Sequence, residues 1–173
     1  MNSIPFIILI FVCVLSHIIR FAYELLKHKN IVQPSGLSFI TIFLNMALLW
    51  VSWFALCSQD EFKIILPGTI RYIGLLIVLI GLVIFLTALF TIKTLENYEG
   101  DLITKGIYSK IRHPMYLGFI LWSIGAPVWF GAYFSFFLSF LFIGNILFWR
   151  HLEEIDLVKR FSSYSNYKLK TLF

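Results

Sequence analysis

The chain has 173 residues, of which 60% are hydrophobic and only 13% charged, and its mean hydropathy is +0.87. A soluble domain of this length would carry roughly a quarter charged residues, so the composition indicates an integral membrane protein. The net charge of +5 is a signal of topology and of contact with anionic lipid, and it gives no reason to expect a nucleic-acid partner.

Charge-free runs mark the first three predicted spans. The first, residues 1–19, has no basic region ahead of it and no small-residue cleavage site behind it, so we expect a retained span rather than a signal peptide. Residues 30–59 and 72–92 form the second and third runs. Each run exceeds the ~18 apolar residues that mark a spanning helix.

The fourth run, residues 114–149, is long enough for two rather short spans. Ala126-Pro127 and Gly131-Ala132 interrupt it near its middle, as a tight turn would. The sequence therefore predicts an all-α protein with five transmembrane helices, the last two forming a helical hairpin. We expect one integral membrane domain, residues 1–173, because the length leaves no room for a second globular domain.

Lysine and arginine near the span ends predict the orientation. With the N-terminus outside, the outer side holds only Lys63 and Arg71, and the inner side holds twelve basic residues. We therefore expect the N-terminus outside and the C-terminus in the cytosol. The inner residues are Arg20, Lys27, Lys29, Lys93, Lys105, Lys110, Arg112, Arg150, Lys159, Arg160, Lys168 and Lys170.

Three polar parts are predicted to face the cytosol. Residues 23–36 read as a connector with Pro34 and Gly36 as breakers, and residues 93–113 as a loop that includes Glu96, Asn97, Glu99, Gly100 and Asp101. The third part is the tail that begins at Arg150. No internal repeat or low-complexity tract is visible.

The second and third parts bracket the hairpin, because Pro114 is expected to open its first helix and Arg150 to close its second. Both ends then emerge on the same inner face. This placement brings one group from the loop close to another from the tail, some 35 to 45 positions later in the sequence. The predicted site unites Arg112, His113 and Tyr116 with Arg150, Glu153 and Glu154.

Each of these residues also has an ordinary explanation. Arg112 is a plausible positive-inside anchor and Tyr116 an aromatic-belt residue, while Glu153 and Glu154 suit a solvated tail. Taken together these explanations weaken, since acidic residues contribute little to topology. His17 and Arg20 lie one helical turn apart in the first span; we expect Arg20 to snorkel to the interface and treat His17 as a weaker candidate for substrate contact.

Several chemistries find no support in the sequence. It has no nucleophile elbow, phosphate-binding glycine loop or zinc-ligand set. Cys13 and Cys57 are predicted to differ in depth by something on the order of 10 Å, too far for a disulfide, and we expect both to be inert. His113 and His151 could approach each other, but without a fixed carboxylate arrangement we expect no metal.

A mixed-charge pocket with aromatics, open to the cytosol and walled by helices, suits a polar cofactor from water and a lipophilic substrate from the bilayer. An amino-acid-like cofactor would offer its carboxylate to Arg112 and His113 and its ammonium to Glu153 or Glu154. A sulfonium would be attracted to tyrosine rings by cation–π interaction. These features favour S-adenosylmethionine, although this chemistry alone leaves a nicotinamide cofactor open.

Two motifs carry a family resemblance. Gly106-Ile107-Tyr108, four residues and then the run from Arg112 to Gly118 resemble the signature of the isoprenylcysteine carboxyl methyltransferase family. The same pattern marks a wider set of membrane methyltransferases that includes phospholipid N-methyltransferases. The segment Glu153 to Leu157, followed by Phe161, Tyr164 and Tyr167, is similar to the family's second motif. The match covers roughly residues 95–168, and the first three spans match only in being hydrophobic.

The resemblance implies a cofactor site for S-adenosylmethionine between the inner loop and the C-terminal segment. The family's arginine shortly before the acidic pair is assigned to the substrate, and Arg150 is the nearest here, with Trp149 in the other possible alignment. The implied cofactor contacts are Leu102, Ile103, Tyr108, His113, Pro114, Met115, Tyr116 and Glu153.

The tail departs from the family pattern. Ser162 follows Phe161 where the family usually has glycine, and the spacing to the first tyrosine is one residue short. The proline that often ends the motif is missing after Leu172-Phe173. These departures affect the packing of the tail more than the cofactor site, and they argue against a close match to the eukaryotic enzymes. We therefore expect a prokaryotic cell membrane.

The expected reaction is methyl transfer to a lipophilic acceptor, in which positioning is the main task. A carboxylate acceptor would need no base, and Arg150 would hold one of its oxygens. An amine or thiol acceptor would need Glu154 or His113 to take a proton. The alternatives are a phospholipid N-methyltransferase, an NADPH-dependent membrane reductase of the sterol-reductase type, for which Lys105 and Lys110 are only a weak hint, and a non-enzymatic scaffold. No obligate protein partner is evident.

Overall fold

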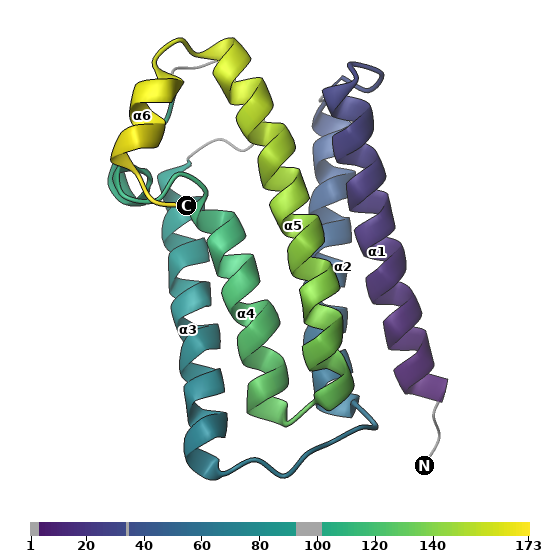
Figure 1. Cartoon of the computed structure of the whole chain (residues 1–173). Coiled ribbons are helices and arrows are strands. Elements are labelled where there is room, and N and C mark those ends of the chain that lie inside the picture. The colour runs from purple at the N-terminus through teal and green to yellow at the C-terminus, as the bar shows by residue number, and fades with distance from the viewer. Residues whose placement is uncertain (1–3, 34, 93–101) are drawn as a thin grey trace.

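The structure is a computed structural model that describes residues 4–33, 35–92 and 102–173 (Figure 1). Five long helices lie side by side, and two short helices, η1 and α6, gather at the end of the bundle opposite the N-terminus. The described residues contain no strand, only two isolated β-bridges. The helices are α1 (Ile4–His28), α2 (Gly36–Gln59), α3 (Gly68–Thr91), η1 (Gly106–Ser109), α4 (Pro114–Phe130), α5 (Tyr133–Arg160) and α6 (Tyr164–Lys170).

The bundle has the surface of a membrane protein. Among the described residues, α1, α2, α3 and α5 are long and apolar enough to cross a membrane, and α4 is an apolar helix of 17 residues. A helix of 24 residues is about 36 Å long, which exceeds the ~30 Å hydrocarbon core. Large apolar side chains cover the outer faces, as lipid contact requires. They include Ile7, Phe11, Leu44, Ile73, Val83 and Phe140.

Helix ends differ from the sequence-based expectation at two places. The helix α1 continues to His28, so much of the expected 23–36 connector is helical. The helix α5 does not close at Arg150 but runs ten residues further, to Arg160. Hydropathy marks where a segment leaves the lipid, whereas nothing in His151 to Arg160 stops a helix. Two sets of predicted features lie outside the described residues: Pro34, and the loop residues Glu96, Asn97, Glu99, Gly100 and Asp101.

The turn between α4 and α5 lies at Gly131-Ala132. Gly131 has a φ of 66° and ends α4 in the left-handed conformation that favours glycine. Pro127, predicted to help interrupt the run, lies inside α4 instead. The segment that connects α2 to α3 is hydrogen-bonded to this turn. Ile64 N donates to Gly131 O at 2.8 Å, and Tyr133 N donates to Phe62 O at 2.9 Å.

Asp60, at the C-terminal end of α2, stabilises the start of α5. Its carboxylate accepts hydrogen bonds from the backbone N and the hydroxyl of Ser135, both at 2.7 Å. The first amides of a helix have no intrahelical partner, so Asp60 caps α5 from another helix. The two basic residues at this end serve carbonyls: Lys63 Nζ donates to Cys57 O and Phe130 O, and Arg71 Nε donates to Trp129 O.

The helices α3 and α4 pack through glycines. A Cβ on Gly74 would lie 2.8 Å from the carbonyl oxygen of Gly125, and one on Gly81 would lie 2.9 Å from that of Gly118. Both pairs are spaced by seven residues, so they fall on one face of each helix. Small residues let backbones approach closely in a membrane. This packing fixes α4, and with it Pro114, against α3.

The helices α1 and α5 run parallel with a constant offset. His17 meets Asn145 and His28 meets Asp156, each across 128 positions. Phe6 and Phe134 pack edge to face with ring centroids 5.6 Å apart, at the same offset. The C-terminal end of α1 therefore lies beside the polar end of α5.

Candidate functional site

The site is built on the residue that precedes α4. Pro114 occupies the first turn of the helix, where its missing N–H costs nothing. The residue before a proline is kept out of the helical region, and His113 accordingly has φ −123° and ψ 61°. The His113 residue is only 5% exposed. The local sequence thus buries an imidazole at the end of the bundle where η1 and α6 gather.

The helix α5 supplies two carboxylates to this imidazole. His113 Nδ1 lies 3.6 Å from Glu153 Oε2, and His113 Nε2 lies 3.4 Å from Glu154 Oε1. The hydroxyl of Tyr164 in α6 lies 3.3 Å from the same Nε2 atom. Tyr116, one turn into α4, forms a side-chain hydrogen bond with Glu153. Three helices therefore converge on one buried histidine.

Arg112 ties the C-terminal segment to this cluster. Its Nε donates to Glu154 Oε1 at 3.3 Å, while its Nη1 donates to the carbonyl oxygens of Lys168 at 3.0 Å and Thr171 at 2.7 Å. The backbones are also paired, since Arg112 N donates to Leu172 O and Leu172 N to Lys110 O. The guanidinium therefore caps the end of α6 and clamps it beneath the loop.

Glu154 is held from three sides. Besides Arg112 and His113, the Nζ atom of Lys168 donates to Glu154 Oε2 at 2.7 Å. Both carboxylate oxygens accordingly have cationic partners. Glu153 is less enclosed, with a side chain that is 39% exposed against 11% for Glu154.

The aromatic residues of α6 back the site. The hydroxyl of Tyr167 donates to the backbone oxygen of Tyr108 in η1 at 2.6 Å. Tyr164 and Tyr167 are buried in a small apolar cluster with Leu157, against which Leu102 and Phe161 pack. The family-like tail motif thus places its tyrosines under the loop that precedes α4.

Burial and charge act in opposite directions on His113. Burial lowers the pKa of the imidazole, but hydrogen bonding to Glu153 and Glu154 and their negative charges outweigh it, so the pKa of His113 lies above its ordinary value. Burial, followed by the charge of Glu154, raises the pKa of the Tyr164 hydroxyl. The site therefore favours a protonated histidine and a neutral tyrosine.

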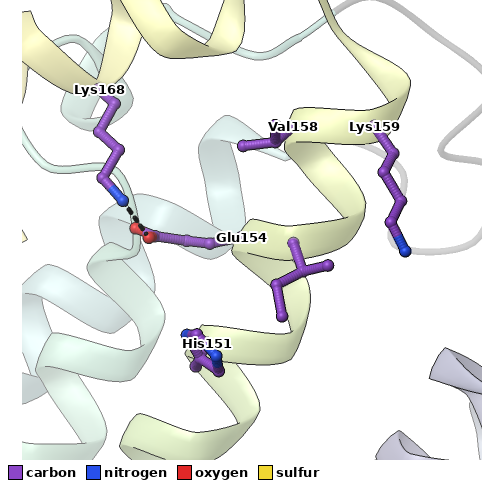
Figure 2. Close-up of a pocket in the computed structure, with 6 residues that line it drawn as sticks. His151, Glu154, Val158, Lys159 and Lys168 are labelled. Carbon is purple, nitrogen blue, oxygen red and sulfur yellow. Dashed lines mark hydrogen bonds and ion pairs between the residues drawn. The ribbon is translucent and has the colours of Figure 1, made fainter.

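A hollow of about 290 Å³ adjoins the cluster between α5 and α6. Figure 2 shows Lys168 reaching across from α6 to Glu154, with His151 and the other residues along α5. His151 lines this hollow and is exposed to solvent. The lining residues are His151, Glu154, Ile155, Val158, Lys159 and Lys168.

The structure brings together most of the residues that the sequence singled out. Arg112, His113, Tyr116, Glu153 and Glu154 form one cluster, which Pro114 and Met115 adjoin in the chain. Of the other predicted cofactor contacts, Tyr108 accepts a hydrogen bond from Tyr167, and Leu102, which Ile103 follows, packs against the apolar cluster of Tyr164 and Tyr167. Arg150 lies against the C-terminal residue, with its Cζ atom 4.6 Å from the centre of the Phe173 ring. Trp149, the alternative at this step, is fully buried in the bundle.

Sequence reasoning missed two residues at or near the site, Lys168 and Glu24, and one helix cap at the opposite end of the bundle, Asp60. Lys168 follows Tyr167 directly but was not assigned to the site. Glu24 lies four residues after Arg20, a helical spacing that signals an ion pair, and it is 5% exposed. Arg20, which is expected to snorkel toward the interface, pairs with this carboxylate one turn nearer the C-terminal end of α1. Asp60 gave one signal, because it begins an acidic pair with Glu61 directly after a long apolar run.

The cysteines and the potential metal ligands form no further site among the described residues. Cys13 and Cys57 are both free and buried. Across residues 4–33, 35–92 and 102–173, no group of three or more histidine, cysteine, aspartate or glutamate side chains is arranged to hold a metal ion.

The fold and site define an integral membrane protein of all-α class with a charged and aromatic cluster at one end of the bundle. The sequence profile of the family described as phospholipid methyltransferase matches residues 70–163, which run from the first turn of α3 to the residue before α6. The chain belongs to this family.

Curated relatives carry a related name. The chain is 34% identical over 134 residues to the protein-S-isoprenylcysteine O-methyltransferase of Xenopus laevis, covering 68% of this chain and 45% of that protein. It is 35% identical over 82 residues to the enzyme of the same name from Schizosaccharomyces pombe, covering 43% and 33%. For the human enzyme the identity is 31% over 111 residues, covering 56% and 39%.

The chain thus spans less than half the length of these relatives. No solved structure matched the chain.

Proposed function

We propose that the chain is an S-adenosylmethionine-dependent methyltransferase that acts on a lipophilic acceptor, similar to the protein-S-isoprenylcysteine O-methyltransferases. One observation carries the proposal. A buried histidine, two glutamates and an arginine converge from both flanks of a membrane hairpin, in a chain of a methyltransferase family. Neither lipid packing nor topology requires that convergence.

The residues at this cluster fit S-adenosylmethionine. The partly exposed carboxylate of Glu153 has the charge to accept the cofactor's ammonium. The ring of Tyr116, whose centroid lies 5.8 Å from that of His113, offers a π face to a cation. The cofactor supplies an electrophilic methyl group when bound. Further proposed contacts are Leu102, Ile103, Tyr108, Pro114 and Met115.

The protein's own residues would hold this arrangement rigid. Arg112 is proposed to orient the C-terminal segment, because its guanidinium is engaged by Glu154 and two carbonyls. A second role for Arg112, toward the cofactor's carboxylate, would require some of these bonds to exchange. Protonated His113, fixed between Glu153 and Glu154, would be the donor beside it.

The acceptor would approach along the bundle from the bilayer. For a carboxylate acceptor, Arg150 is the proposed contact and no base is needed. For an amine or thiol, the proton would pass to Glu154 or His113. Glu154 has cationic partners at both oxygens, and the pKa of His113 is raised by its two carboxylate neighbours, so the site favours an acceptor that is already anionic.

We further propose the membrane arrangement. All five long helices would cross the membrane, with the N-terminus outside and the cluster on the cytosolic side of a prokaryotic cell membrane. Lys63 and Arg71 are the two basic residues on the proposed outer side. Both donate to helix carbonyls at that end, so their presence there is explained without a cytosolic location. Cysteine labelling of single-cysteine variants at Ile65 and Leu169, both highly exposed, would test it.

Calorimetry of the purified protein in detergent with S-adenosylmethionine and with NADPH tests the function. We expect the first to bind, and binding of NADPH alone would overturn the proposal in favour of a membrane reductase. His113→Ala and Glu153→Ala should each weaken cofactor binding by ~1–3 kcal/mol, as for a lost charge-assisted hydrogen bond. Intact affinity in both folded variants would show that the site is elsewhere.

The family's description favours one alternative acceptor, a phospholipid amine. Mass spectrometry of cells that overproduce the protein separates the two. Methyl groups on lipid headgroup amines would support the phospholipid reaction, and methyl esters on isoprenylated or other acids would support the leading proposal.

A further inference from the structure

A second polar cluster lies within the bundle, on α1. His17, Arg20 and Glu24 follow one another at helical spacing and share one face of the helix. His17 and Glu24 are each 5% exposed, and the Arg20 side chain is 15% exposed. They face α5, since His17 stacks on Phe142 and Trp149 with centroid separations of 3.8 and 5.5 Å. Ionisable groups inside a membrane bundle are costly and tend to be functional.

The proton of His17 can be placed from its neighbours. The amide nitrogen of Asn145, Nδ2, donates to the backbone oxygen of His17 at 3.4 Å. The carbonyl oxygen of the amide could not make this bond, so the orientation of the Asn145 amide is fixed. The same nitrogen lies 3.1 Å from His17 Nδ1, which must then accept. A neutral His17 therefore carries its proton on Nε2. That atom is buried and has no hydrogen-bond partner among the described residues.

Arg20 and Trp149 add two more unused donors. The Arg20 guanidinium pairs with Glu24 through Nη2 and lies 5.4 Å from the centre of the Trp149 ring. Within the described part of the chain, Arg20 Nε and Trp149 Nε1 are buried without a hydrogen-bond partner. Three N–H donors from two helices are thus left over at one place. A leftover set made only of donors matches an anionic oxygen.

This cluster adjoins the proposed cofactor site. The charges of Arg20 and Glu24 act on the hydroxyl of Tyr116, which itself bonds to Glu153. The nearby charge of Lys27 acts on Glu153 as well. A group bound beside Arg20 and His17 would therefore have the cofactor residues on one side. On its other side it would have the apolar lengths of α1 and α5.

We propose that His17, Arg20 and Trp149 form the subsite that binds the anionic oxygen of a lipid-like acceptor. The inference rests on the proposed methyltransferase function and names the residues that hold its substrate. Trp149 is fully buried among the helices, and the guanidinium beside its ring comes from Arg20. For an anionic acceptor this subsite would replace the Arg150 contact proposed above. The helix α1 lies outside residues 70–163, so the family match does not assign this role.

Two variants test the subsite without emptying the core. His17→Phe keeps a ring between Phe142 and Trp149 and removes both ring nitrogens. The double variant Arg20→Gln with Glu24→Gln removes the charges together, so that neither is left buried alone. Lys29→Gln is the matched control, because Lys29 is an exposed cation just beyond the same end of α1.

The measurement is calorimetric binding in detergent, without cofactor, of three probes. They are N-acetyl-S-farnesylcysteine, its carboxamide, and dioleoyl phosphatidic acid. We expect one of the two anions to bind wild type, and both variants to weaken it at least tenfold. The carboxamide should bind at least tenfold more weakly than its acid if the acid is the ligand. Lys29→Gln should stay within twofold.

The outcomes separate the subsite from the proposed function. Dependence on the variants for phosphatidic acid alone would assign the subsite to a phospholipid headgroup. Binding of neither anion, or equal binding in wild type and both variants, would overturn the subsite. Affinity for S-adenosylmethionine, measured on the same samples, should stay within twofold. If wild type fails to bind that cofactor, the methyltransferase proposal fails while the anion titrations still decide the subsite. If the double variant does not fold, His17→Phe decides alone.

Discussion

Replacing Arg112 with alanine tests whether one guanidinium holds the C-terminal segment on the site. The side chain makes three hydrogen bonds, to Glu154, Lys168 O and Thr171 O. Hydrogen bonds that involve a charged group contribute roughly 1.5–3 kcal/mol each. The bond to Lys168 O is exposed and Glu154 keeps its bond to Lys168 Nζ, so we expect a loss of only about 2–4 kcal/mol in the free energy that closes this segment.

Hydrogen exchange in detergent measures this loss directly. Leu172 N donates to Lys110 O at 2.8 Å and Tyr167 N donates to Ser163 O at 3.1 Å, so both amides report on closure. A loss of 2–4 kcal/mol corresponds to roughly 30- to 700-fold faster exchange at these amides. Lys170→Ala, an exposed change in the same short helix, should leave exchange within a few-fold.

The reasoning is refuted if Arg112→Ala leaves the protection of residues 161–173 unchanged while the rest of the bundle is intact. Arg112→Lys sharpens the test. A lysine keeps the charge but lacks the planar fork that reaches a carboxylate and two carbonyls together. We expect its exchange rates to fall between those of wild type and Arg112→Ala.

Three further predictions concern thermal unfolding in detergent. Gly125→Leu should destabilise the protein by at least about 1–3 kcal/mol, because its Cβ would lie 2.7 Å from Gly74 O, whereas Gly144→Ala meets nothing within 4 Å and should be close to neutral; equal effects would contradict the packing described for α3 and α4. The pKa of His113 is raised in the folded state, so its contribution is full below its ordinary pKa and is lost as the pH rises through the folded value; unfolding temperature should fall over that window in wild type, and an identical profile in His113→Gln would exclude the histidine as the cause. Asp60→Ala removes the cap of α5 and should cost about 1–3 kcal/mol, well above the cost of Glu61→Ala, and similar values would rule out a special role for Asp60.

Much of the candidate site was predictable because its signals are local. Proline after His113 announces the start of a helix, and charge after a long apolar run announces its exit from lipid. Together they place Arg112, His113 and Tyr116 at the same boundary as Glu153 and Glu154, as the structure has it. The family resemblance added Tyr164 and Tyr167, whose contact with the loop no periodicity predicts.

Other features were beyond the reach of the sequence for physical reasons. Hydropathy does not predict the continuation of α5 past Arg150, because it reports whether a segment prefers lipid or water and not whether its backbone is helical. The engagement of Arg112 with the end of α6 depends on where a tail of ordinary polarity folds back. Which residue at the Trp149 and Arg150 step faces the bundle is a matter of one helical position, about 100° of rotation, and it is set by packing against α1.

The sequence by itself determined the class of this protein: a helical membrane bundle with charge gathered at one end. Long apolar runs and misplaced charges act through the large transfer energies of lipid and water, which each segment meets independently. The tertiary structure decided which helices are neighbours, and so which donors are satisfied. Glycines bring α3 against α4, and a constant register brings α1 against α5, where His17, Arg20 and Trp149 are left with unused N–H groups. Such partnerships depend on shape complementarity between distant segments, which no single segment encodes.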